Sequence, residues 1–135
     1  MDNVCVDDLV GVRFTAAGRT VEDGLDCWGL AMEVFRRYGV VLPDYQVAPE
    51  AYKEIDYIAA GAMQKSMWKR VVVDGVVKRP LIALMRVHER FITHVGVYIG
   101  NGKIIHTTRD TNVVISNVNM LQAVITGYYR YDPSN

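Results

Sequence analysis

The best-defined hydrophobic pattern in the chain runs from Cys27 to Tyr38. Apolar residues recur along it at the spacing of one helix face and charged residues take the other face, namely Leu30, Ala31, Val34, Phe35 and Tyr38 against Glu33, Arg36 and Arg37. Asp26 suits the N-cap position, and Gly39 suits the position just after the helix. The pattern therefore predicts an amphipathic helix that begins at a cysteine.

Two weaker helical patterns flank this segment. Residues Met1 to Val10 offer a modest apolar face, and we expect Cys5 to lie beside it as a small, inert hydrophobe. Pro49 suits a first helical turn, and the apolar residues after it predict a second helix through about Met67. Gly11 to Gly24 carries turn residues, so it is expected to be a loop that can form one wall of a cleft.

From Trp68 onward the hydrophobic period changes to that of strands. Asp74-Gly75 predicts a hairpin between Trp68–Val73 and Val76–Lys78. Further strands are expected at Leu81–Val87, His94–Gly100, Lys103–Thr108, Asn112–Val118 and Ile125–Tyr131, with a short turn or helix at Asn119–Val124. This order predicts a single α+β domain over residues 1–135, with N-terminal helices packed on a central antiparallel sheet of about five to six strands.

Charge and composition narrow the classes of partner. The 135 residues carry 15 basic and 15 acidic side chains, so no overall field favours nucleic acid or a membrane surface. Met1 to Asp26 is acid-rich and Lys65 to Arg90 is base-rich, which fits either two solvated faces or a partner surface. No apolar run reaches the ~18 residues of a membrane span, and the acidic N-terminus lacks a signal-peptide core. We therefore expect a chain made in the bacterial cytoplasm without a signal peptide, with no nucleic-acid or membrane partner.

The two cysteines, Cys5 and Cys27, form neither a disulfide framework nor a zinc pattern, although a single bridge between them remains open. Cys27 stands where a helix is predicted to begin. Free N–H groups and the positive end of the helix dipole favour a thiolate there. We therefore expect Cys27 to be a reactive nucleophile.

A thiol nucleophile needs a base, and the base needs a group that orients it. His94 opens one predicted strand and His106 lies on the next. A two-residue turn at Asn101-Gly102 would put the two rings on opposite faces of the sheet. A three-residue turn, or a bulge with Gly102 left-handed, would put His106 opposite Gly96, on the same face as His94 and roughly 7–8 Å from it by Cα.

The catalytic hypothesis therefore predicts an odd-length turn. It also explains Gly96, whose missing side chain leaves space beside the two rings. The alternative is that both histidines are hydrogen-bonded structural groups. His88 lies in a polar loop beside Glu89 and Arg90, and we expect it to be exposed to solvent and outside the site.

Several motifs together resemble one protein family. These are Gly24-Leu25-Asp26-Cys27-Trp28-Gly29-Leu30, then Leu42-Pro43-Asp44-Tyr45, then the run from His94 to His106. In this order and spacing they resemble the NlpC family of cell-wall cysteine peptidases over about residues 11 to 131. Trp28, the Leu-Pro-Asp-Tyr segment and the closing Gly127-Tyr128-Tyr129-Arg130 are similar to its phage-tail branch.

The resemblance implies a papain-like site on an α+β fold. Family members typically cleave the bond between D-γ-glutamate and a diamino acid in peptidoglycan stem peptides. Matched by motif, Cys27 is the nucleophile, His94 the general base and His106 the residue that orients it. The backbone N–H of Cys27 would help bind the oxyanion. No metal or organic cofactor is implied.

The chain departs from the family pattern in two places. Family members often have a tyrosine near the oxyanion about a dozen residues before the cysteine, where this chain has Phe14. Loss of one such donor costs roughly 10²–10³ in rate. The usual Pro-Gly-Asp reads Pro80-Leu81-Ile82, which predicts a modified turn. Trp28 replaces the commoner serine and either lines the cleft or packs in the core. The predicted substrate cleft comprises Phe14, Asp26, Trp28 and Gly96.

The leading hypothesis is a cysteine hydrolase of peptidoglycan stem peptides. The resemblance places it in a phage or prophage tail, with phage tail proteins as candidate partners and the cell wall as the place of action. One alternative is a structural tail-assembly protein with a weak or inactive site. Another is an acyltransferase or amidase that uses the same Cys-His pair.

Overall fold

A computed structural model describes residues 4–45, 67–74, 76–86 and 94–133 of the chain. Its elements, in chain order, are η1 (Asp7–Leu9), β1 (Arg19–Thr20), β2 (Gly24–Leu25), α1 (Cys27–Arg37), β3 (Trp68–Val71), β4 (Leu81–Met85), β5 (His94–Tyr98), β6 (Lys103–His106), β7 (Val114–Asn117), α3 (Val118–Leu121) and β8 (Ile125–Tyr131). Within these residues, no helix has the length and apolar character needed to cross a membrane.

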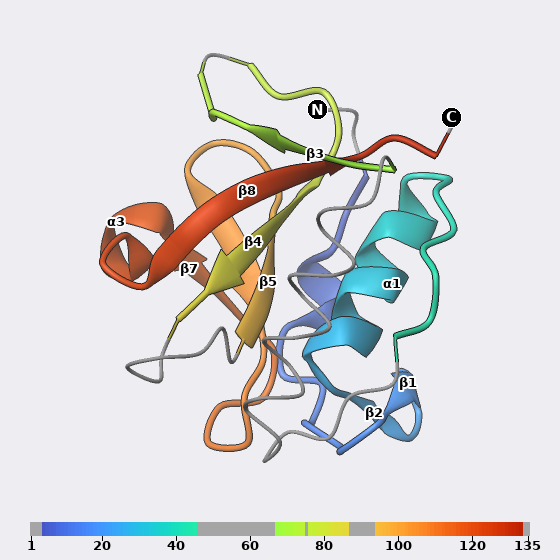
Figure 1. The fold of residues 1–135 in the computed structure, drawn as a ribbon. Helices are drawn as coiled ribbons and strands as arrows, with labels where there is room; N and C mark the ends of the chain where they lie inside the picture. The colour runs from blue at the N-terminus through green and yellow to red at the C-terminus, as the bar shows by residue number, and fades with distance from the viewer. Residues whose placement is uncertain (1–3, 46–66, 75, 87–93, 134–135) are drawn as a thin grey trace.

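Six strands form one antiparallel sheet in the order β3-β8-β4-β5-β6-β7 (Figure 1). Strands β4 to β7 follow one another as a meander, and β8 returns across the sheet to lie between β3 and β4. The predicted α+β fold with a sheet of about five to six strands is confirmed. Strand β8 begins and ends where the pattern placed it, at Ile125 and Tyr131.

The predicted hairpin at Asp74-Gly75 is wrong. Val76–Lys78 is not a strand, and Gly75 lies outside the described residues. Strand β3 pairs instead with β8, with Trp68 opposite Tyr131 and their ring centroids 4.8 Å apart. An Asp-Gly turn signal is local, whereas strand pairing depends on the packing of side chains against cross-strand neighbours. The long strand β8 offers those neighbours and the short segment after Gly75 does not.

The N-terminal predictions also need correction. Of the described part of Met1 to Val10, residues 4–10, only Asp7–Leu9 is helical, as one turn of 3-10 helix that buries Leu9, and Gly11 follows with a positive φ of 92°. Cys5 is exposed and is not a packed hydrophobe. The expected loop from Gly11 to Gly24 contains a small ribbon, in which β1 pairs with β2. The predicted helix from Pro49 and the loop with His88 lie outside the described residues, although Met67 itself is described.

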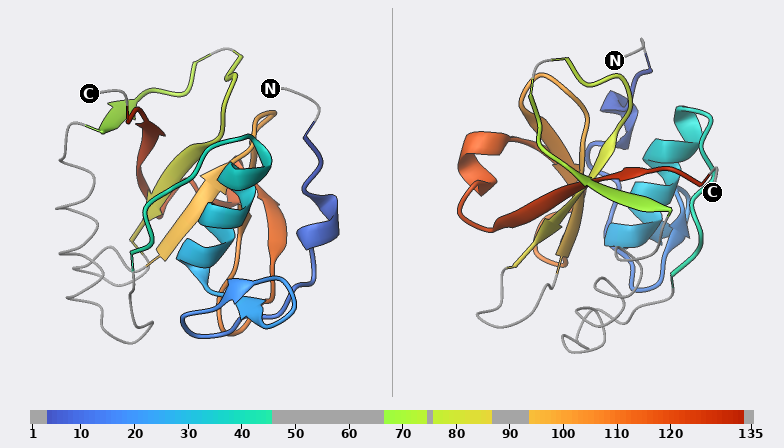
Figure 2. Two further views of the ribbon diagram at one scale, coloured as in Figure 1. Left: turned by 90° about the vertical axis from the view of Figure 1, so that its right-hand side faces the viewer. Right: turned by 45° about the horizontal axis from the view of Figure 1, so that its top comes forward.

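Apolar side chains cover both faces of the sheet. Helix α1 packs on one face, where Leu30, Val34 and Phe35 belong to the same buried cluster as Val95, Val97 and Ile105. On the other face, Leu81, Ala83, Tyr98 and Ile104 form a second cluster with side chains of α3 and β8. Figure 2 shows α1 and α3 on opposite sides of the sheet. Helix α1, and with it Cys27, is therefore held against strands β4 to β6.

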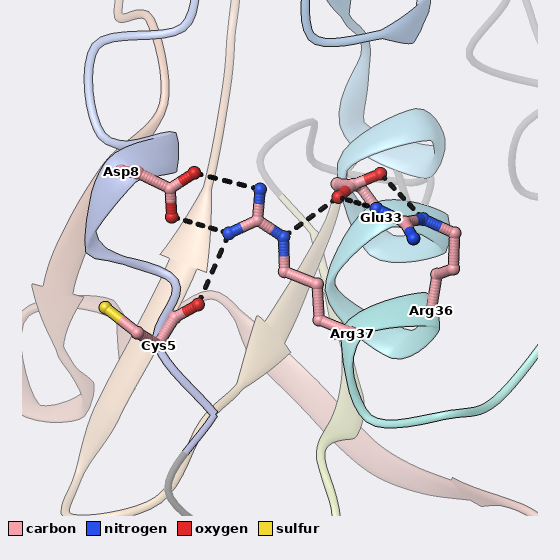
Figure 3. Close-up of polar contacts among 5 residues, drawn as sticks. All are labelled: Cys5, Asp8, Glu33, Arg36 and Arg37. Atoms are coloured by element: carbon pink, nitrogen blue, oxygen red, sulfur yellow. Dashed lines mark hydrogen bonds and ion pairs between the residues drawn. The ribbon is translucent and has the colours of Figure 1, made fainter.

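Arg37 ties the N-terminal segment to α1 (Figure 3). Its guanidinium donates hydrogen bonds to Asp8 Oδ2 at 3.0 Å, to Glu33 Oε2 at 2.9 Å and to the Cys5 carbonyl at 3.3 Å. The same Glu33 accepts from Arg36 at 2.7 Å. Side-chain bonds, together with the burial of Leu9, fix the short 3-10 turn in place of the helix that was expected there.

Candidate active site

The start of helix α1 is capped as predicted. Asp26 has extended backbone angles, φ −88° and ψ −175°, and its carboxylate accepts the Gly29 N–H at 2.7 Å. Cys27 is the first residue of the helix. The cap satisfies one of the free N–H groups at the helix end. It also fixes where the chain passes from the ribbon formed by β1 and β2 into the helix, and so it fixes the position of Cys27.

Arg19 holds this cap in place. It donates to Asp26 Oδ1 at 2.6 Å, to Asp44 Oδ1 at 2.8 Å and to the Tyr45 carbonyl at 3.1 Å. Asp26 is buried, and burial raises the pKa of its carboxyl while the Gly29 N–H and Arg19 act to lower it. One arginine thereby links the helix start to the Leu42–Tyr45 segment, which is the second of the three sequence motifs. No pattern in the sequence singled out Arg19.

Trp28 belongs to an aromatic cluster. Its indole N–H donates to the Pro43 carbonyl at 2.8 Å, and its ring lies 5.0 Å from that of Tyr45 and 6.2 Å from that of Trp68. The side chain is buried, with 5% of its surface exposed. Of the two roles considered for Trp28, core packing is the one that these contacts support.

The thiol of Cys27 is not the thiolate that the helix end was expected to produce. Burial raises its pKa to about 11, and the nearby Asp26 charge raises it further, against the lowering effect of the Val95 and Trp28 N–H groups and of Arg19. The free-energy cost of removing a thiolate from water is larger than the stabilisation that the helix N-terminus gives to the thiolate. Cys27 is therefore a neutral thiol at pH 7, and both cysteines are free.

The thiol lies against strand β5 beside the N–H of Val95, the residue after His94. Residues alternate along a strand, so Val95 belongs to the cluster under α1 and His94 points to the opposite side. His94, the first residue of β5, is thus the neighbour in sequence of the residue whose N–H the thiol contacts.

The two histidines share one face of the sheet. Val97 pairs with Ile105 and Tyr98 with Ile104, a register that puts His106 opposite Gly96. The turn has three residues, Gly100 to Gly102, and all three have positive φ. It closes through the Lys103 N–H, which donates to the Gly100 carbonyl at 3.0 Å. The predicted odd-length turn is confirmed, and the ring centroids of His94 and His106 lie 5.6 Å apart at an interplanar angle of 73°.

Gly96 leaves space that the side chains around it occupy. A Cβ atom on Gly96 would lie 2.7 Å from Met85 Cε, 2.9 Å from Ile104 Cγ2 and 3.3 Å from His106 Cβ. The neighbouring side chains already fill the volume that a larger residue would require. The predicted close packing at Gly96 is present, and His106 is one of the three neighbours, together with Met85 and Ile104.

The polar atoms of the two rings are unequally satisfied. His106 Nε2 lies 2.9 Å from Ser116 Oγ. Among the buried side-chain polar atoms of the described residues, His94 Nε2 and His106 Nδ1 are the ones without a hydrogen-bond partner. Burial, together with the neighbouring His106, lowers the pKa of His94 to about 3, and burial also lowers the pKa of His106. Both imidazoles are therefore neutral at pH 7 and able to accept a proton.

Phe14 lies beside β2, the strand that precedes helix α1. Its backbone forms a parallel bridge with Leu25, two residues before Cys27, and its N–H donates to Asn112 Oδ1 at 3.3 Å. The side chain is half-buried and has no hydroxyl. The described residues contain no group of three or more histidine, cysteine or acidic side chains placed to hold a metal ion.

A thiol at a helix start and two adjacent histidines on an antiparallel sheet are the elements from which a thiol hydrolase site is built. The chain belongs to the NlpC/P60 family, which it matches over residues 11–130. Members of this family are hydrolases.

Among its relatives, the chain is 31% identical to the murein DD-endopeptidase MepS/murein LD-carboxypeptidase of Escherichia coli K12 over 113 residues, which are 83% of this chain and 50% of that protein. It is 25% identical to the γ-DL-glutamyl hydrolase of Bacillus subtilis 168 over 129 residues, 93% of this chain and 28% of that protein. The chain thus spans half or less of these relatives. The solved NlpC/p60 domain of the peptidoglycan hydrolase SagA has the same fold, with a TM-score of 0.60 at 18% identity, over 91% of this chain and 90% of that domain.

Proposed function

We propose that this protein is a cysteine hydrolase that cleaves peptidoglycan stem peptides at the bond between D-γ-glutamate and the diamino acid. The observation that carries the proposal is the placement of Cys27 at a capped helix start against β5, with His94 and His106 on one face of adjacent strands. The substrate class is supported by the relatives, whose names describe a γ-DL-glutamyl hydrolase and a murein endopeptidase.

The charge states of the site shape the proposed mechanism. Cys27 is a neutral thiol and His94 a neutral imidazole, so proton transfer from sulfur to His94 accompanies the attack of sulfur on the amide carbonyl carbon. N–H groups at the start of α1 stabilise the oxyanion that forms. His94 then gives the proton to the departing amine of the diamino acid, and a thioester remains on Cys27. Water, deprotonated by His94, hydrolyses the thioester, while His106 orients His94 throughout.

The proposal extends to a place of action. Trp28, the Leu42–Tyr45 segment and Gly127 to Arg130 support a role in a phage or prophage tail, through their resemblance to tail-associated members of the family. The protein would be carried to the cell wall in the virion. Purified virions of the corresponding phage should contain the chain in the tail fraction, and its absence from them would contradict this part of the proposal.

Product analysis tests the reaction itself. Purified peptidoglycan is digested with the protein, and the fragments are identified by mass spectrometry with and without an added amine. We expect fragments that end at the γ-carboxyl of D-glutamate, with a free carboxylate in both conditions. Cleavage at another bond would overturn the proposed specificity, and an amide product in the presence of amine would instead indicate an acyltransferase.

A second candidate function is structural. Phe14 has no hydroxyl to offer to an oxyanion, and the pKa of the Cys27 thiol is raised to about 11. Both features favour a tail-assembly protein with a weak or inactive site. A stable complex with tail proteins, together with no turnover of any stem peptide, would support this function over hydrolysis.

A further inference from the structure

Ser116 contacts the site from the outermost strand of the meander. It lies on β7 opposite Ile104 of β6, two pairs along the ladder from His106, which is opposite Val114. Ser116 and His106 therefore project from the same face, and Ser116 Oγ lies 2.9 Å from His106 Nε2. The serine side chain thus contacts His106 at Nε2, while the other ring nitrogen, Nδ1, has no hydrogen-bond partner.

The hydrogen bond to Ser116 bears on where His106 carries its proton. A neutral imidazole has one nitrogen that donates and one that accepts, and a hydroxyl can bond either kind. If Ser116 accepts, His106 is protonated at Nε2 and its Nδ1 is an acceptor. If Ser116 donates, the two roles are exchanged. The partner of Nε2 therefore decides what Nδ1 can do.

The neighbouring ring distinguishes the two cases. His94 Nε2 and His106 Nδ1 are both buried and neither has a hydrogen-bond partner in this structure, although the centroids of the two rings lie 5.6 Å apart. A base that takes a proton at Nδ1 must carry its own proton at Nε2, and this N–H needs an acceptor. His106 Nδ1 is that acceptor only when His106 is protonated at Nε2, which requires Ser116 to accept.

We propose that Ser116 is a positioning residue that accepts a hydrogen bond from His106 Nε2–H and so holds His106 in the tautomer that can orient His94. Its link to catalysis rests on the hydrolase function proposed above. The two rings do not bond in this structure. In the proposed arrangement they turn so that His106 Nδ1 accepts from His94 Nε2–H, and His94 Nδ1 keeps the lone pair that receives the thiol proton. Protonation of His94 leaves its Nε2–H bonded to His106, so the neutral and charged base are held in one orientation.

The tautomer is measured directly by long-range ¹H–¹⁵N correlation spectra of protein labelled at histidine, recorded where the histidines are neutral. We expect the wild-type chain and Ser116→Thr to show His106 protonated at Nε2, because threonine keeps the hydroxyl and suits a strand. Ser116→Ala should shift His106 toward the Nδ1-protonated form. Asn117→Ala is the matched control, because Asn117 accepts a bond from Lys103 across the same strand pair at 2.6 Å and, as the next residue of the strand, projects from the opposite face to Ser116.

Kinetics supply the second readout. Ser116→Ala should lower kcat about tenfold or more with KM within twofold, since a partner that fixes a histidine tautomer acts on the chemical step. Ser116→Thr and Asn117→Ala should keep the wild-type kcat. Wild-type His106 protonated at Nδ1, or Ser116→Ala with unchanged spectra and kcat, would overturn the proposal. If the wild-type protein hydrolyses no stem peptide, the spectra still decide the direction of the hydrogen bond, so failure of the hydrolase proposal is distinguishable.

Discussion

Burial sets the charge state of each group at the candidate site. His94 and His106 have 8% and 9% of their surface exposed, and both are held neutral. The thiol of Cys27 is held neutral for the same reason, although it stands at a helix start. Residue type and helix position indicated a candidate nucleophile, but they did not indicate its protonation state, which depends on how much water the folded chain removes.

This burial makes folding stability depend on pH. His94 has an unfolded pKa near 6.5 and a folded pKa of about 3, so below pH 6.5 the unfolded chain binds a proton that the folded chain does not. Its contribution is fully present above pH 6.5 and is lost as the pH falls toward 3. At pH 5 the expected loss is about 2 kcal/mol from this residue alone. Urea unfolding at pH 7.5 and pH 5 measures it, and a His94→Gln variant should show a smaller difference between the two. Equal differences in both proteins would contradict this assignment.

Substitution of Phe14 by tyrosine is predicted to raise the activity. Phe14→Tyr restores a hydroxyl at the position where family members often carry one, beside Leu25 and the helix start. One oxyanion donor is worth roughly 10²–10³ in rate, so we expect kcat for a stem peptide to rise about tenfold or more. The comparison needs only initial rates of the two purified proteins. An unchanged kcat would mean that the hydroxyl does not reach the oxyanion.

Several site residues could be identified from the sequence, and others could not. Cys27, His94 and His106 stood out by residue type and by their places at predicted element ends. Ser116 and Arg19 did not, because each acts through a partner that only the folded chain brings near. Ser116 could have been found only from the register of β6 against β7, which places it diagonal to His106, and the sequence did not determine that register.

At the scale of elements, the start of α1 is the best-supported feature. Its cap is buried, and Asp26 there has Arg19 as its cationic partner at 2.6 Å. We expect Arg19→Ala to lower the free energy of unfolding by about 2 kcal/mol, because it leaves a buried carboxylate without its partner.

Arg36→Ala is the matched control for that substitution. It removes another arginine–carboxylate pair, Arg36 with Glu33, but the Arg36 side chain is 66% exposed and Glu33 keeps its bond from Arg37. Exposed pairs contribute little. Urea denaturation of the two variants should therefore show a clearly smaller loss for Arg36→Ala. Equal losses would mean that Arg19 adds nothing beyond an ordinary surface pair.

Predictions of elements succeeded where the partner was near in sequence or the pattern was long. Helix α1, the turn between β5 and β6, and β8 were all predicted correctly. The hairpin after β3 was wrong because β3 takes its partner from the C-terminal end of the chain. The first helix was reduced to one 3-10 turn, because Asp8 bonds Arg37 across the fold and Gly11 follows at once.

At the scale of the whole molecule, the sheet brings distant residues together. Cys27 comes from the first half of the chain, whereas His94, His106 and Ser116 come from three consecutive strands of the second half. The packing of α1 against β5 therefore brings Cys27 and the two histidines together only when the whole domain is folded. The two-layer order was predictable from helices preceding strands, but the insertion of β8 between β3 and β4 was not, because nothing local specifies it.

The central claim is that Cys27 performs the chemistry, and the two cysteines of the chain allow a matched test. Turnover of a stem peptide with a D-γ-glutamyl–diamino acid bond is measured for the wild-type protein, Cys27→Ala and Cys5→Ala. Cys5 is exposed, and its carbonyl accepts a bond from Arg37, the last residue of α1, whereas Cys27 is the first. We predict that Cys5→Ala cleaves the peptide at the wild-type rate, while Cys27→Ala shows no turnover and keeps its Tm within a few degrees. Undiminished hydrolysis by Cys27→Ala would contradict the account.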